Sequence, residues 1–151
     1  MGARTLEELV TWRLLVAFKE EVYRLIDGSP TAKRDYKWRD QLKDAALSAE
    51  SNVAEGFHRF RRKQMLLFYG YARGSHAEAE KRLKDGIARR HFTDRECEPG
   101  LRLAKRSGKA LLELIKSIER LEAEGIPEPK PPRGRQPPSP RKPPISPEGG
   151  G

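Results

Sequence analysis

The chain has 151 residues, of which 36% are hydrophobic and 35% are charged, a composition that suits one modest globular domain with a polar extension. Its formal net charge is +9, which favours polyanionic partners, and its one cysteine excludes an intrachain disulfide and a cysteine-cluster zinc site. Because no apolar signal core or membrane-length run occurs, we expect a cytoplasmic protein with no membrane partner.

Apolar residues recur at helical spacing in four successive segments, and no segment shows sustained alternation. The first predicted helix runs from Thr5 to Asp27 and is ended by the Gly and Pro of "DGSP"; the second runs from Asp35 to Gly56, and the third from Arg62 to Arg90. The fourth begins at a capping box, Thr93 followed by Glu96 three residues later, and carries a heptad-like seam. Such helices with short connections predict an all-α fold, an antiparallel up-and-down four-helix bundle over residues 1–125.

The remaining segment, residues 126–151, holds ten of the twelve prolines and almost no large apolar side chain. A segment of this composition cannot bury enough surface to offset its ordering entropy, so we expect a disordered, basic, Pro-rich tail. The tail could act as an electrostatic arm or as a plain linker. Without it the domain still has 26 basic residues against 20 acidic ones, so its own surface is basic.

Polar side chains interrupt the apolar pattern of the second predicted helix. Ser48, Asn52 and Glu55 share one helix face. A similar stripe on the third predicted helix consists of Tyr71, Ser75, Glu78 and Arg82. The two stripes could form a buried network that fixes helix register, face solvent, or face another subunit. No Ser–His–Asp or Cys–His arrangement accompanies them, so we expect no catalytic residue and no enzymatic activity.

Glu55 and His58 have the Glu-x-x-His spacing of di-iron bundles, but such a metal site requires two of these motifs. The third predicted helix offers only His76 and Glu80, four residues apart, so we expect no metal and no cofactor. Gly56 is expected to end its helix in a left-handed conformation. The small residues around Gly74 would let another helix approach closely.

Basic residues collect at both ends of the expected bundle. The turn between the second and third helices contributes His58, Arg59, Arg61, Arg62 and Lys63. The opposite end contributes Lys33, Arg34, Arg89 and Arg90. Cations at a helix N-terminus oppose the helix dipole, so helix stability does not explain those at 61–63. We interpret both groups as electrostatic nucleic-acid contacts or solvated surface. Phe57 and Phe60 could stack bases or seal the bundle end.

The two central helices resemble a known family, the proteins associated with intervening sequences in bacterial 23S ribosomal RNA. Its first signature is matched by Gln41, Leu42, Ala45, Ala46, Ser48, Asn52, Val53, Ala54, Glu55, Gly56 and Arg59. Its second block is matched by Ala72, Gly74, Ser75, Glu78 and Glu80. We expect the polar and glycine members of these motifs to be structural.

The resemblance implies a four-helix protomer in a ring-like homopentamer. It also implies kinship with the accessory variability proteins of diversity-generating retroelements, which bind nucleic acid and a reverse transcriptase. The expected function is therefore non-enzymatic binding of RNA or DNA, largely through phosphates, as an accessory to a reverse transcriptase or to RNA-processing machinery. Five copies would carry a charge of +45, which would self-repel without counterions or a polyanion. The alternatives are a protein-interaction scaffold with an incidental basic surface and a bundle metalloenzyme.

Overall fold

The computed structural model describes residues 2–131, and no strand occurs within that range. Its elements, in chain order, are η1 (Leu6–Glu8), α1 (Val10–Asp27), α2 (Pro30–Arg34), α3 (Tyr36–Phe57), α4 (Arg62–Ala88) and α5 (Asp94–Ala123). The all-α prediction is confirmed. The predicted disorder of the tail concerns mainly residues 132–151, which lie outside the described residues.

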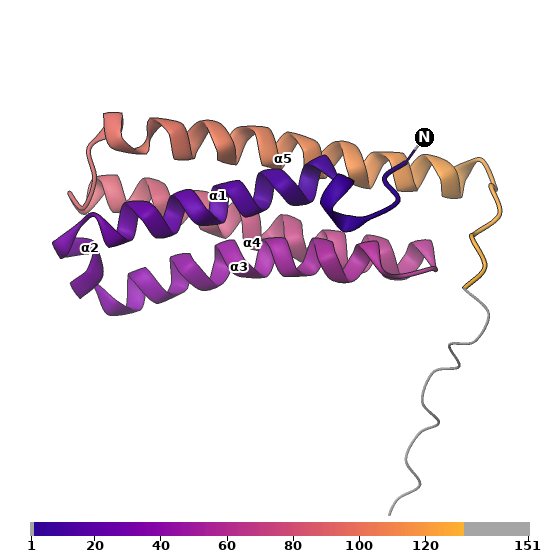
Figure 1. Ribbon diagram of the computed structural model, residues 1–151, viewed down its shortest axis with the longest axis horizontal. Helices are drawn as coiled ribbons and strands as arrows, with labels where there is room; N and C mark the ends of the chain where they lie inside the picture. Colours follow the sequence, from indigo (N-terminus) through magenta and orange to yellow (C-terminus); the bar gives the residue numbers. More distant parts are fainter. Residues whose placement is uncertain (1, 132–151) are drawn as a thin grey trace, which may run out of the picture.

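The four long helices run alternately up and down and form a closed bundle (Figure 1). Each packs against two others: α1 and α4 each contact both α3 and α5. The α3–α4 turn, the N-terminal segment and the end of α5 share one end of the bundle, while α2 and the α4–α5 turn form the other. The two groups of predicted basic residues therefore lie at opposite ends, as the up-and-down arrangement predicts.

Local capping explains most helix boundaries. The predicted capping box at the start of α5 is present: the Glu96 N–H donates to Thr93 Oγ1 at 3.1 Å, and the Thr93 N–H donates to Glu96 Oε1 at 3.2 Å. The short helix α2 was not predicted; Pro30 opens it, and Ser29 Oγ accepts the Ala32 N–H at 3.2 Å. The single predicted first helix is interrupted at Leu9, whose extended backbone separates η1 from α1.

The bundle core consists of two apolar clusters. One lies toward α2 and is built around Phe18, Trp38 and Leu83; the other lies toward the α3–α4 turn and is built around Tyr69 and Leu111. A buried polar pair occupies the middle of α4 and α5: the His76 imidazole Nε2 and the Ser107 hydroxyl are 2.9 Å apart. Ser107 also donates to the Leu103 carbonyl at 2.7 Å. The fully partnered pair keeps its buried polar atoms satisfied.

The prediction for Gly56 was wrong in its mechanism. The helix continues through Phe57, and among the described glycines only Gly125 has a positive φ, 65°. A Cβ at Gly56 would instead lie 2.6 Å from the Tyr69 ring on α4. Glycine at this position therefore allows α3 to pack directly against a buried aromatic side chain.

Candidate nucleic-acid interface

The α3–α4 turn projects cations and an aromatic ring from one end of the bundle. His58, Arg59, Phe60 and Arg61 are exposed, as is Lys63 in the first turn of α4. Arg59 is partly neutralised by Glu55, at 3.1 Å, and stacks over the Phe68 ring with 4.8 Å to its centroid. Neither Arg61 nor Lys63 has a carboxylate within 4.0 Å among residues 2–131. These two side chains carry the uncompensated positive charge of the turn.

Arg62, which we expected to contact phosphates, turns inward and is only 5% exposed. Its guanidinium donates to the carbonyls of Ile126 and, at 3.2 Å, Pro127. It also lies 3.4 Å from both the Leu121 carbonyl and a Glu122 carboxylate oxygen at the end of α5. Arg62 is therefore a C-terminal cap for α5 and a clamp on the following segment, and it is not available to a ligand.

The segment held by Arg62 belongs to the range that the sequence assigns to the tail. Glu128 returns to the bundle, where its Oε1 accepts the Arg62 backbone N–H at 3.0 Å. A carboxylate at the first residue of α4 compensates the helix dipole that the turn cations oppose. Residues 126–128 thus contact the bundle, so the folded part extends a little beyond the predicted boundary at residue 125.

The opposite end has a second group of charges, part of which is neutralised. Arg89 lies 2.9 Å from an Asp35 oxygen and 2.7 Å from an Asp85 oxygen. His91 Nε2 lies 2.8 Å from the same Asp35 carboxylate. The hydrogen bond from His91, together with Arg89, lowers the pKa of Asp35 below its ordinary value. This network joins the α2–α3 junction to the α4–α5 turn, so Arg89 has a structural role.

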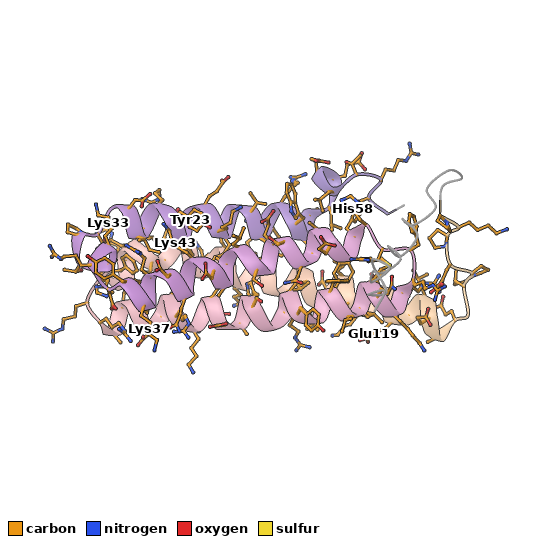
Figure 2. All side chains as sticks on the ribbon, turned by 90° about the horizontal axis from the view of Figure 1, so that it is seen from below. Tyr23, Lys33, Lys37, Lys43, His58 and Glu119 are labelled. Atoms are coloured by element: carbon orange, nitrogen blue, oxygen red, sulfur yellow. The ribbon has the colours of Figure 1, made fainter. Side chains whose placement is uncertain are left out.

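The other cations of this end have no carboxylate partner in the described part of the chain: Lys33, Arg34 and Arg90 are all exposed. Figure 2 shows Lys33 and His58 near opposite ends of the bundle. Arg90 is unusual because its φ is 61°, the left-handed region that favours glycine. It follows the end of α4, where the His91 N–H donates to the Gly86 carbonyl at 2.9 Å.

A third basic surface, which sequence reasoning missed, lies midway along α5. Its exposed members are Arg102, Lys105, Arg106 and Lys109. Only Arg102 has an ion-pair partner within the described chain, Glu98 at 3.5 Å. No acidic residue occurs between Glu98 and Glu113, and like charges four residues apart destabilise a helix slightly. The spacing of basic residues in "LRLAKRSGK" is the sequence signal from which this surface could have been predicted.

The two polar stripes meet at the edge of the α3–α4 contact. Ser48 Oγ and Ser75 Oγ are 2.9 Å apart, and the Asn52 amide donates to the Ser48 carbonyl at 2.8 Å. All three side chains are partly buried, whereas Glu55 is exposed. On α4, Gly74 and Glu78 are also exposed, Glu78 pairing with Arg82 at 3.0 Å and Glu80 with Lys84 at 3.3 Å. The motif therefore lies partly at the helix contact and partly on the outer surface.

Cys97 and the potential metal-ligating side chains are the other chemically reactive groups of the described residues. Among residues 2–131, no three His, Cys, Asp or Glu side chains are placed to hold a metal ion together. Burial raises the pKa of the Cys97 thiol to about 11, so the thiol stays protonated near neutral pH. Within the same residues no helix is long and apolar enough to cross a membrane. The exposed cations are thus the chemically distinctive feature of the surface.

Comparison with known proteins places this bundle in a family. The sequence model of the family described as 23S rRNA-intervening sequence protein matches residues 7–113. The chain belongs to this family. The match spans α1 to α4 and most of α5, and includes the two motif-bearing helices and the α3–α4 turn. No curated protein matches the chain.

Proposed function

We propose that this chain is a non-enzymatic nucleic-acid-binding protein that contacts phosphates through the exposed cations of its bundle. Membership of a family described by an RNA intervening sequence supports an RNA-related role. The observation that carries the proposal is the separation of the cations into two kinds. Arg62 and Arg89 are used by the fold, while Arg61, Lys63 and Arg90 are exposed and lack carboxylate partners in the described part.

Three surfaces would then contact a polyanion: the turn, the opposite end and the middle of α5. With 30 residues, α5 is about 45 Å long, several times the Debye length of about 8 Å in physiological salt. The two ends would therefore act as independent electrostatic sites. A ligand that touches both must extend along the bundle, and the cations at 102–109 lie on that path. The affinity would depend on phosphates much more than on sequence.

We further propose that the protein is a homo-oligomer, as the family resemblance implies, with α4 contributing to the interface. Leu67 and Tyr71 are 50% and 54% exposed, and they share a face with Gly74. Nothing lies within 4 Å of a Cβ built at Gly70 or Gly74, so packing within the protomer does not explain either glycine. A glycine inside a helix costs about 1 kcal/mol relative to alanine, which close approach of a second copy would offset.

The binding proposal is tested by neutralising matched pairs of cations. Arg61→Gln combined with Lys63→Gln removes two charges from the turn, while Arg73→Gln combined with Lys116→Gln removes two exposed charges from the long faces of α4 and α5. We expect the turn variant to weaken binding of a single-stranded RNA in low salt. Its salt dependence should be shallower by about 0.7 for each phosphate that the variant no longer neutralises. Equal effects of the two pairs would refute a role for the turn.

The same exposed face of α4 supports a second candidate, a scaffold that binds another protein, such as a reverse transcriptase. Light scattering from the full chain separates the candidates. A mass five times that of one chain supports the pentamer. A monomer in solution would contradict self-association and would favour a different protein as the partner of the α4 face. The nucleic-acid binding assay is a separate measurement, and its result does not depend on the oligomeric state.

A further inference from the structure

A groove of about 370 Å³ separates the α3–α4 turn from the segment that follows α5. Its apolar lining comes from the Phe60 ring and from Pro129 and Pro131. Its polar lining includes His58, Arg61 and Gln64. The volume lies at the lower end of the range of roughly 300–1,000 Å³ for small-molecule sites. A flat, partly polar group with an anionic attachment matches this lining.

Phe60 is 42% exposed. The turn that carries it is fixed on both sides: the Arg59 N–H donates to the Gly56 carbonyl at 3.1 Å, and the Met65 N–H donates to the Arg61 carbonyl at 3.0 Å. A large ring held in water loses the favourable free energy of burial. Phe60 lies between Arg59 and Arg61 in the sequence. A ligand that is both aromatic and anionic could stack on the ring while the arginines attract its negative charge.

The segment that leads into the facing wall is held by hydrogen bonds. The clamp by Arg62 on the Ile126 and Pro127 carbonyls holds the start of the segment, and Glu128 accepts the Arg62 N–H. The prolines that follow lack an N–H, so their rings add apolar surface without a donor. Because Glu128 already occupies the N-terminus of α4, a bound phosphate would depend on side chains such as Arg61. The groove thus combines an apolar slot with the side chains of Arg59 and Arg61, and with Glu128, whose carboxylate is engaged by the Arg62 N–H.

We propose that this groove takes one unpaired nucleobase of a single-stranded nucleic acid, stacked on Phe60, with the adjoining phosphate held by Arg61. The inference rests on the proposed nucleic-acid binding and specifies its ligand. The bases of a duplex are stacked on one another and cannot present a face to the ring, whereas those of a single strand can. The protein would therefore prefer single strands at this end and bind duplexes only through phosphates.

The test uses the full chain and three probes of about 12 nucleotides, within the usual range of single-strand site sizes. They are a single strand with bases, an abasic strand of equal charge, and a duplex. The single strand with bases is tested both as RNA and as DNA, which shows which of the two nucleic acids the groove prefers. Fluorescence anisotropy in low salt should show the strand with bases binding roughly ten-fold more tightly than the abasic strand. Phe60→Leu, which keeps an apolar side chain without an aromatic face, should abolish that difference, and Phe60→Trp should preserve it.

The outcomes separate this inference from the function on which it rests. If wild type binds the abasic strand and the strand with bases equally, or Phe60→Leu leaves their ratio unchanged, base stacking is refuted while phosphate binding stands. If no probe binds, including the duplex, the proposed function itself is refuted. Equal affinity for the RNA and DNA strands would show that the base and phosphate suffice without the 2′-hydroxyl.

Discussion

Two helices of this bundle end in the same hydrogen-bonded motif but place different residues in its left-handed position. After α4 the residue is Arg90, with φ 61°; after α5 it is Gly125, with φ 65°. In the second motif the Ile126 N–H donates to the Leu121 carbonyl at 3.1 Å. A side chain in this conformation costs roughly 1–2 kcal/mol, whereas glycine adopts it freely. Glycine also gives the unfolded chain more freedom, which costs roughly 0.4–1 kcal/mol. The net gain from glycine at position 90 is therefore about 1 kcal/mol.

Comparing Arg90→Gly with Arg90→Ala isolates this backbone effect, because both substitutions remove the same guanidinium and only glycine relieves the conformation. We expect the glycine variant to be more stable than the alanine variant by about 1 kcal/mol. That difference corresponds to about 3–4 °C in melting temperature for a domain of this size. Urea and thermal unfolding followed by circular dichroism would measure it. Measurements in high salt would screen the interaction between the Arg90 guanidinium and the C-terminal dipole of α4, so that the backbone effect dominates the comparison with wild type.

The reasoning would be refuted if the two variants unfold together or if glycine is the less stable. Arg90 also connects stability with function. Since strained backbone conformations cluster at functional sites, we expect Arg90→Gly to be more stable than Arg90→Ala, while both variants lose affinity for nucleic acid to the same extent. Unchanged affinity in both variants would remove Arg90 from the proposed contacts.

Three further predictions concern the interior. Gly56→Ala should lower the free energy of unfolding by about 2 kcal/mol, because its methyl group overlaps the Tyr69 ring on α4; an unchanged or higher urea midpoint would contradict this. Burial lowers the pKa of His76, against an opposing effect of Glu80. The unfolded chain then binds the proton more readily, so stability should fall as the pH drops below about 6.5 and level off below the folded pKa. In denaturant titrations at several pH values, His76→Gln should reduce the pH dependence of the free energy of unfolding. An unchanged pH profile would show that other groups cause it. Arg62→Met should cost about 1–3 kcal/mol and expose residues 126–131 to limited proteolysis; wild-type resistance would show that the clamp is dispensable.

The helices and their order were predictable because local patterns determine them. Phe18 and Val22 in α1 and Leu42 in α3 lie on the apolar stripes of their helices, and all three are fully buried. The capping box at Thr93 depends only on residues three positions apart. A resemblance in α3 and α4 was sufficient to identify the family, since eleven positions of one signature occur within a single helix and the turn that follows it. Predictions of this kind depend on residues close together in sequence.

The features that were missed depend on residues far apart in sequence. Arg62 resembles its neighbours in the basic turn, and only the return of residues 126–128 to the bundle shows why it is buried. Gly56 fits the sequence rule for a helix end, but the requirement for glycine comes from the Tyr69 ring on the next helix, which leaves no room for a Cβ atom. The clamp and the close approach of α3 to α4 both arise from tertiary packing, for which the single sequence has no local signal.

The most direct test of phosphate binding is the salt dependence of affinity for a single-stranded RNA, measured with the full chain. Three phosphate contacts, the number that the exposed cations Lys33, Arg34 and Arg90 could supply at one end, predict a slope of about −2 in a plot of log affinity against log salt. Contacts at the other surfaces would make it steeper. A slope near zero, or no complex even in low salt, would contradict the account.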